Sequence, residues 1–132
     1  MENGLVIKDS PYDVDTTYNS LKTLLTNNPN LKILLELDHS ANAASVDLKL
    51  NPTKVIMFGN PKLGTPLMQV SATTGIDLPQ KIVVYTAADG STKIGYNDPT
   101  YLKKRHQIED MDTIINTISG ALNTITNAVI ES

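Results

Sequence analysis

The sequence has no cysteine and no tryptophan, and it has one phenylalanine, Phe58, beside five tyrosines. The lack of cysteine excludes disulfide bonds, thiolate metal sites, iron–sulfur clusters and cysteine nucleophiles. Aromatic residues make up only 5% of the chain, so the core has to consist mainly of leucine, isoleucine, valine and alanine. The chain also lacks the GxSxG motif of a serine nucleophile and the HxH and HExxH motifs of metal sites.

The chain also lacks an excess of positive charge and a long apolar run. Its 11 basic and 14 acidic residues give a net charge of −3, which argues against nucleic acid as a partner because that binding depends on Lys and Arg at phosphates. No apolar run approaches the roughly 20 residues of a membrane helix. The start, MENGLVIKDS, has neither the basic region nor the apolar core of a signal peptide. We therefore expect one cytoplasmic domain over residues 1–132.

The first third of the chain predicts a strand, a helix and a second strand. After the apolar run at 5–7, Asp13 is placed to cap a helix whose apolar face recurs at spacings of 4, 3 and 4 over residues 14–25. Asn27-Asn28-Pro29 ends that helix. Leu31, Ile33, Leu35 and Leu37 then share one face of an expected strand. The alanine-rich residues 39–46 predict a short helix or turn.

The middle of the chain alternates two-sided apolar strands with turns. Residues 53–58 and 81–86 are apolar on both faces, which is typical of central strands. Thr65-Pro66 predicts the N-cap and first residue of a short helix between them. Asp89-Gly90 predicts a hairpin with a primed turn, and residues 91–96 the returning strand. Asp98-Pro99 repeats the pattern of a cap followed by proline.

The last segment is the longest periodic one. Apolar residues recur at spacings of 3 and 4 from Ile108 to Val129, and Ala121 and Ala128 widen the stripe. This stripe favours a helix docked on a sheet over a coiled coil, because few charges flank it. The element order predicts an α+β fold with a mixed, mostly antiparallel sheet and the longer helices on one face.

Several strings in the middle of the chain form an ordered pattern: Leu37-Asp38-His39, Pro52-Thr53, Phe58-Gly59-Asn60-Pro61, Gly64-Thr65-Pro66-Leu67-Met68, Leu78-Pro79 and Tyr96-Asn97-Asp98-Pro99. The pattern resembles domain-of-unknown-function family 302, and its string FGNPxxGTPLM is specific. The resemblance implies a compact fold similar to the TATA-binding-protein-like β-α-β4-α arrangement, no assigned biochemical activity, and a capacity to dimerise. Asp47 stands where relatives often have glycine.

The turn from Gly59 to Thr65 is the most unusual stretch of backbone chemistry. It comes near a phosphate-binding loop, but the lysine that would reach the phosphates is missing and Pro66 has no amide to offer. One interpretation is structural, with Gly59 and Gly64 at unusual φ values and the Asn60 side chain holding the turn. The other is a small polar or anionic ligand held by Asn60, Lys62 and the amides after Thr65.

The two histidines have competing interpretations. His39, at the end of a strand, is either satisfied locally or contacts a ligand, and no neighbouring ligands support a metal site. His106 and Glu109, beside Lys103, Lys104 and Arg105, predict a solvated surface patch.

These observations predict a binding domain without a visible catalytic group, metal or identifiable cofactor. The expected site lies at an edge of the sheet where strands end, and its candidate residues are His39, Asn42, Asn60, Lys62, Thr65 and Tyr96. The alternative function is a homo-oligomeric assembly module that carries out no small-molecule chemistry. An enzyme is the less favoured reading because no nucleophile and base can be paired.

Overall fold

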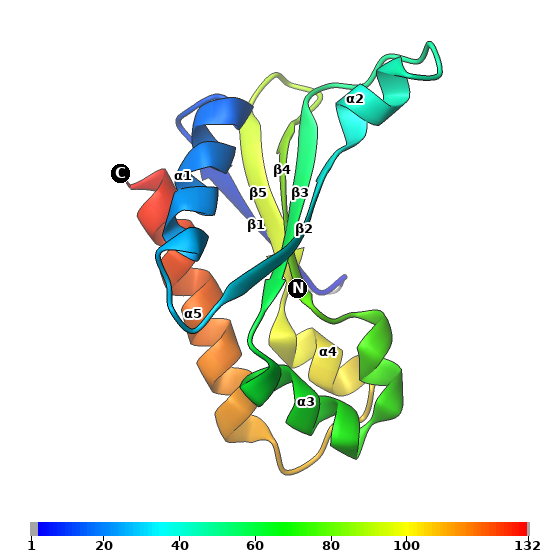
Figure 1. The fold of residues 1–132 in the computed structure, drawn as a ribbon, viewed down its shortest axis with the longest axis vertical. Coiled ribbons are helices and arrows are strands. Elements are labelled where there is room, and N and C mark those ends of the chain that lie inside the picture. Colours follow the sequence, from blue (N-terminus) through cyan, green and yellow to red (C-terminus); the bar gives the residue numbers. More distant parts are fainter. Residues whose placement is uncertain (1–2, 132) are drawn as a thin grey trace.

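The computed structural model describes residues 3–131. Its elements in chain order are β1 (Leu5–Ser10), α1 (Val14–Thr26), β2 (Lys32–Asp38), α2 (His39–Ala44), β3 (Thr53–Gly59), α3 (Pro61–Val70), the 3-10 helix η1 (Ala72–Ile76), β4 (Gln80–Thr86), β5 (Thr92–Asn97), α4 (Pro99–Arg105) and α5 (Asp112–Ile130). Figure 1 shows them as a sheet with the two longest helices on one side.

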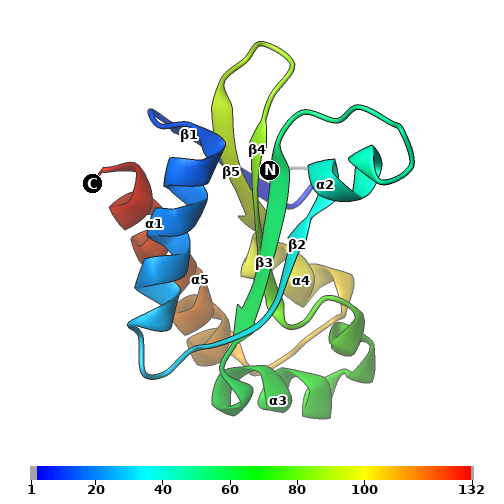
Figure 2. The same ribbon diagram turned by 45° about the horizontal axis from the view of Figure 1, so that its top comes forward.

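The sheet has five strands in the order β1-β5-β4-β3-β2, and every neighbouring pair is antiparallel. Helices α1 and α5 contact each other and cover the same face (Figures 1 and 2). Without the short helices the order is β-α-β4-α, so the predicted α+β class is confirmed. The short helices α3 and α4 lie together at one end of the sheet, and α2 projects at the other (Figure 1).

The hydrophobic core lies between the sheet and these two helices. Alternate residues of the central strands point into it, including Ile56 and Phe58 of β3 and Ile82 and Val84 of β4. Helix α1 contributes the predicted face over 14–25, and α5 contributes Ile115, Ile118, Leu122 and Val129. The stripe in the last segment therefore docks on the sheet, as its pattern predicted.

Helix caps follow the sequence in two places and depart from it in a third. The carboxylates of Asp13 and Asp98 accept the amides of Thr16 and Thr100, as expected of N-caps. The helix predicted to begin at Thr65-Pro66 instead begins at Pro61, and Pro66 lies inside it. Asn60-Pro61 and Thr65-Pro66 both have the form of a cap followed by proline. The helix starts at the first pair because Asn60 caps it and Pro61 fits its first turn.

The edge strand β2 does not keep the predicted alternation. A register shift between Ile33 and Leu35 places Leu34 in a bulge, so that Leu35 pairs with Met57 on the open face, where 46% of it is exposed. The prediction that Leu35 shares the face of Ile33 is wrong for this reason.

The hairpin between β4 and β5 has a longer loop than predicted. Ala87 N–H donates to the Ser91 carbonyl, so the loop between them has three residues. Within it, Gly90 N–H donates to the Ala87 carbonyl. Gly90 has φ 88°, whereas Asp89 is not among the residues with positive φ, so the primed two-residue turn is wrong.

Asp47 adopts φ 60°, in the left-handed region that favours glycine. Glycine, which the resemblance leads one to expect here, would adopt this angle without strain, and aspartate is among the residues that tolerate it. Among residues 3–131, no helix combines the length and apolar character needed to cross a membrane.

Candidate functional site

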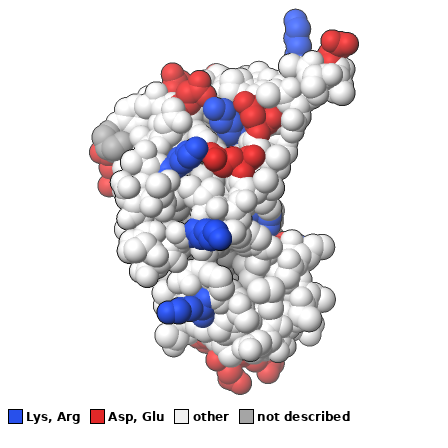
Figure 3. Space-filling view, in the orientation of Figure 1, with Lys and Arg blue, Asp and Glu red and all other residues white. Residues whose placement is uncertain are grey.

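A pocket of about 310 Å³ lies where β3 ends and α3 begins. Its size is at the lower end of small-molecule sites, which commonly run from about 300 to 1,000 Å³. The surface is hollowed between the main body and the part formed by α3 and its neighbours (Figure 3). Positive side chains border this hollow in the same view, and the lining includes Lys32.

The walls of the pocket come from four parts of the chain and are mostly apolar. The family-like strings supply one side, with Phe58, Gly59, Pro61, Gly64, Met68, Leu78 and Pro79. Helix α5 supplies the opposite side with Ile118, Ala121, Leu122 and Ile125. Leu31, which precedes β2, and Leu34 within it complete the lining on that part of the chain. Three of the strings that carry the resemblance, those beginning at Phe58, Gly64 and Leu78, therefore line this cavity. The strings at residues 37–39, 52–53 and 96–99 do not belong to its lining.

The two glycines of the turn have ordinary backbone angles, and what they provide is space beside the pocket. Neither Gly59 nor Gly64 has a positive φ, so the expectation of unusual φ values is wrong. A Cβ built at Gly64 would stand 3.5 Å from Leu78 Cδ1, and one at Gly59 would stand 3.4 Å from Pro79 Cβ. Both positions are ordinary van der Waals contacts, so a side chain there would occupy the pocket wall without a backbone clash.

Polar groups at the pocket are few and belong to Lys32, Asn60, Thr65 and Gln80. Asn60 Oδ1 accepts the Lys62 amide at 3.0 Å, and the Asn60 carbonyl accepts the amides of Leu63 and Gly64. The predicted structural role of Asn60 in this turn is therefore confirmed. The first amides of α3 are already used in this way, which leaves the polar side chains of the pocket as its hydrogen-bonding groups.

The six predicted site residues do not converge. Asn60 and Thr65 line the pocket, whereas Lys62 lies on the exposed side of α3 outside it. Tyr96 is buried in the core, where burial raises its pKa and Thr126 of α5 is its hydrogen-bond partner. Only two of the six therefore belong to one cavity.

His39 and Asn42 lie on α2, at the other end of the sheet from Asn60. Asp38 pairs with Lys54 at the start of β3, and Asn60 follows its last residue. A strand of this length spans about 20 Å at roughly 3.3 Å per residue, so the two groups cannot contact one small ligand. Both side chains of α2 are exposed, and a ligand role for them stays a prediction.

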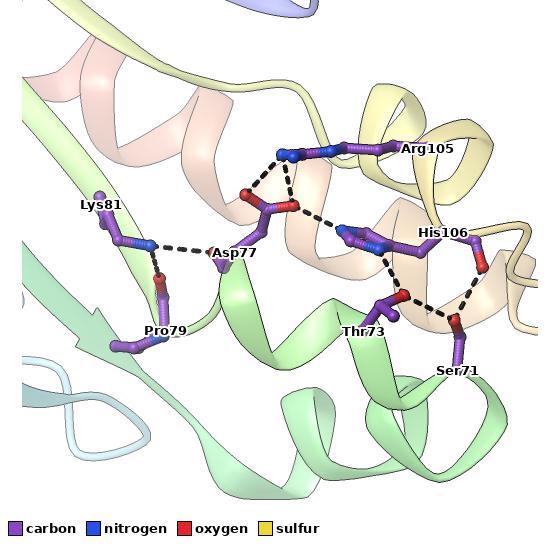
Figure 4. Close-up of polar contacts among 7 residues, drawn as sticks. All are labelled: Ser71, Thr73, Asp77, Pro79, Lys81, Arg105 and His106. Carbon is purple, nitrogen blue, oxygen red and sulfur yellow. Dashed lines mark hydrogen bonds and ion pairs between the residues drawn. The ribbon is translucent and has the colours of Figure 1, made fainter.

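A cluster that the sequence did not indicate joins η1 to the end of α4 (Figure 4). His106 is only 8% exposed, and its ring nitrogens contact Asp77 Oδ2 at 2.5 Å and Thr73 Oγ1 at 2.8 Å. Arg105 Nη1 donates to both carboxylate oxygens of Asp77 at 3.1 and 3.0 Å. The predicted solvated patch is therefore wrong for His106, because Asp77 approaches it from a distant part of the sequence.

The order Thr73–His106–Asp77 resembles a hydroxyl–imidazole–carboxylate relay, but its surroundings favour a structural role. None of these side chains belongs to the lining of the pocket, so no adjoining substrate site is defined for the hydroxyl. The imidazole is satisfied whether neutral or charged, since Thr73 can accept or donate. Asp77 and His106 are also the residues that end η1 and α4, so their contact holds the two elements together.

A second polar group fastens β1 to α5. Lys8 Nζ donates to Asn123 Oδ1, Thr126 Oγ1 and Asn127 Oδ1 at 2.7–2.8 Å, and it lies 5.9 Å from the centre of the Tyr96 ring. Partial burial lowers the Lys8 pKa. Its donors are used within the fold, so this amine serves as an anchor. Over residues 3–131, no three His, Asp or Glu side chains are grouped to hold a metal ion.

Comparison with known proteins identifies relatives along nearly the whole chain. Residues 6–125 match the family described as domain of unknown function DUF302. The proteins named fluoride-specific ion channel FluC 1 of Brucella suis biovar 1 (strain 1330) and of Brucella abortus biovar 1 (strain 9-941) are each 32% identical over 127 residues. These alignments cover 96% of this chain but 50% and 47% of the two relatives, so the chain spans about half their length.

A solved structure has the same fold. The crystal structure of an uncharacterised conserved DUF302 protein from Bacillus stearothermophilus superimposes with a TM-score of 0.77, covering 97% of this chain and 96% of that one at 21% identity. This likeness establishes the fold and leaves the function open. The ordered strings, the match over residues 6–125 and the shared architecture together show that the chain belongs to the DUF302 family.

Proposed function

We propose that this protein binds a small molecule with an apolar body and a polar or anionic end in the pocket beside α3. The observation that carries the proposal is that an apolar cavity with a few polar side chains lies between the specific string FGNPxxGTPLM, at residues 58–68, and helix α5. A cavity with apolar walls and a few polar side chains is the usual form of a small-molecule site.

The ligand class follows from the lining. Phe58, Leu122 and Ile125 offer an apolar interior that suits an aliphatic chain or an aromatic ring. The ammonium of Lys32 and the side chains of Asn60 and Thr65 suit a carboxylate or another polar end group. A small carboxylic acid with a medium-length aliphatic chain or an aromatic ring combines both parts. This class is narrower than the sequence-based expectation of a small polar or anionic ligand.

The test is a titration of isotopically labelled protein with octanoate and, separately, with phenylacetate, followed by amide chemical shifts. We expect the shifts to concentrate at Gly64, Thr65 and Ala121. Native mass spectrometry of freshly purified protein reports in parallel whether a molecule of this class is carried from the cell. Ligand binding should also raise the melting temperature, because it stabilises only the folded state.

A matched pair of variants on α5 provides the control. Ala121→Phe places a ring in the pocket, whereas Ala128→Phe adds the same ring at an exposed position on the same helix outside it. The shifts should disappear in Ala121→Phe and persist in Ala128→Phe. Titrations that leave the pocket amides unchanged, or that Ala121→Phe does not affect, contradict the proposal.

A second candidate rests on the alignment with the fluoride channel proteins. This chain aligns along 96% of its length with about half of each relative, so in those proteins the same module is joined to a further part. The candidate function is that of a module that modulates a fluoride channel when joined to it or added to it. Addition of this chain to vesicles containing such a channel should change the rate of fluoride efflux, and unchanged efflux contradicts it.

The alternative predicted from the sequence, a homo-oligomeric assembly module, stays a prediction. The pocket lies on the helix-covered side of the sheet, so it leaves the open face available for such an assembly.

A further inference from the structure

The lining of the pocket runs from exposed residues to residues of the core. At one extreme, Phe58 and Leu122 are each only 2% exposed and belong to the hydrophobic core. We name these two residues the bottom of the pocket. At the other extreme, Lys32 of β2, Thr65 of α3 and Ala121 of α5 are exposed, and we name these three residues the mouth. The pocket therefore opens to solvent between three elements and ends against the core.

Polarity and charge follow the same direction. The bottom is apolar, whereas the mouth carries the Thr65 hydroxyl and the Lys32 ammonium. The other polar side chains of the lining, those of Asn60 and Gln80, are partly exposed. In the described part of the chain, Lys32 is the one charged residue of this lining.

The Lys32 ammonium is available to a ligand. Within residues 3–131, no carboxylate lies close enough to form an ion pair with it. An ammonium forms its strongest hydrogen bonds with anionic acceptors, whereas a charged group that enters an apolar recess loses its water without compensation. A negative group of a ligand is therefore favoured at the mouth and disfavoured at the bottom.

The size of the pocket limits how much of a ligand it encloses. Its volume of about 310 Å³ is at the lower end of the range for small-molecule sites. A chain of several methylene groups suits such a space, and each methylene that becomes buried improves the affinity about fourfold. A larger polar part has to stay outside, where water satisfies its hydrogen-bonding groups.

We infer that the pocket takes an acyl chain tail first, with the methyl end against Phe58 and Leu122 and the carbonyl end at the mouth. The inference rests on the proposed function, because it concerns the aliphatic members of that ligand class in the same pocket. The class becomes medium-length acyl chains with a negative charge near the carbonyl. Since the group beyond the carbonyl lies in water, this chemistry has two sources, a free carboxylate and the amide or thioester of a larger anionic molecule.

The experiment compares three ligands by calorimetric titration of the full chain. Octanoate presents the free carboxylate, N-octanoylglycine extends the head, and octanedioate places a second carboxylate at the tail. We expect N-octanoylglycine to bind within a few-fold of octanoate. Octanedioate should bind roughly tenfold or more weakly, because its second carboxylate would lose its water beside Phe58 and Leu122.

N-octanoylaspartate is the matched control for charge, because it has two carboxylates, as octanedioate does, but both at the head. It should bind as N-octanoylglycine does. Tighter binding of N-octanoylglycine than of octanoate identifies the conjugated acyl chain as the preferred source, and the reverse order identifies the free acid. If octanedioate binds as tightly as octanoate, or if N-octanoylglycine does not bind, the tail-first orientation is wrong while the proposed function stands. If octanoate does not bind, the proposed function fails and this inference fails with it.

The mouth is tested by Lys32→Gln, with Lys62→Gln as the matched control because Lys62 is exposed and lies outside the lining. Lys32→Gln should weaken the binding of octanoate several-fold and leave that of octanol unchanged, since the alcohol carries no charge. Lys62→Gln should affect neither ligand. Equal effects of Lys32→Gln on octanoate and octanol, including no effect on either, would contradict the placement of the charged end at the mouth. Circular dichroism verifies that both variants stay folded.

Discussion

The two faces of the sheet are built from the same kinds of residues and have different surroundings. Val83 and Val84 are neighbours in β4, yet Val84 is completely buried beneath the helices whereas Val83 lies on the open face and is partly exposed. Strands 53–58 and 81–86 are apolar on both sides, a pattern typical of strands covered twice. The difference shows that an apolar pattern on both faces of a strand does not tell which face is covered, because the order of the strands and the docking of the helices decide it.

The largest effect should separate the two valines. Val84→Ala should lower the free energy of unfolding by about 2–3 kcal/mol, because it removes buried methyl groups and leaves a cavity. Val83→Ala should cost less than about 1 kcal/mol, because this side chain is already partly exposed. Urea unfolding at low protein concentration measures both values. Equal losses would show that the open face is as well packed as the covered one, and the comparison would fail.

The next largest effect concerns the contact of Asp77 with Arg105 and His106, which joins η1 to α4 at one end of the sheet. Asp77→Ala should destabilise the protein by about 2 kcal/mol, since buried His106 and the Arg105 guanidinium both lose an acceptor. Hydrogen exchange should accelerate in η1 and α4 and stay slow in the strands under α1 and α5. Thr73→Val, which removes only one contact of the imidazole, serves as the weaker control. Uniform acceleration in every element would show that this end does not unfold locally.

A smaller effect, which depends on pH, comes from the hydrogen bond between Tyr18 and Glu36 on the helix-covered side of the sheet. The Tyr18 hydroxyl donates to Glu36 Oε1 at 2.7 Å, and this bond is the main cause that lowers the Glu36 pKa below its ordinary 4.5. Burial raises the Tyr18 pKa, which keeps the hydroxyl protonated. A lowered folded-state pKa stabilises the protein above about pH 4.5, and the stabilisation is lost as pH falls through the folded value.

Tyr18→Phe should therefore lose stability relative to the wild type at neutral pH, and the difference should shrink as the pH falls below 4.5. Thermal unfolding at several pH values measures this trend. Glu36→Gln should abolish the pH dependence of the difference. A difference that grows toward acid pH would have the wrong sign for this hydrogen bond.

The smallest effect lies on the open face. Asp9 and Lys93 form an exposed ion pair there, and the bond to Asp9 raises the Lys93 pKa. Exposed pairs of this kind contribute little to stability, so Lys93→Gln should leave the melting temperature of the protein unchanged within error. A marked loss of stability would indicate that this part of the open face is already enclosed in the folded protein.

Much of the fold could be predicted because it depends on local patterns. The caps at Asp13 and Asp98, the stripe of α5 and the two central strands all follow from residue types at short spacing. The start of α3 could not be predicted in the same way, because Asn60-Pro61 and Thr65-Pro66 both have the form of a helix start. In the structure the helix starts at the first of them, where the Asn60 side chain accepts the Lys62 amide, and it continues through the second.

The candidate site was only partly predictable. Asn60 and Thr65 were identified from the unusual turn. The opposite wall of the pocket comes from α5, where the sequence showed Ala121 only as a small residue that widens the apolar stripe. His39 follows the end of β2 and Asn60 follows the end of β3, so the sequence predicted that both, with Asn42, lie at one edge of the sheet. Because β2 and β3 are antiparallel, their ends lie at opposite edges. The contact of His106 with Asp77 spans 29 residues, which no local pattern encodes.

The sequence by itself determined the class of this protein, the positions of most helices and strands, and its place in the family, because these depend on periodicity, capping and short strings. Only the tertiary structure decided which face of the sheet is covered, that residues 58–68 and 78–79 share one apolar pocket with α5, and that α2 and the loop after it project at one end of the sheet. These features arise from strand order and packing, which join residues that are far apart along the chain and therefore leave no local signal in it.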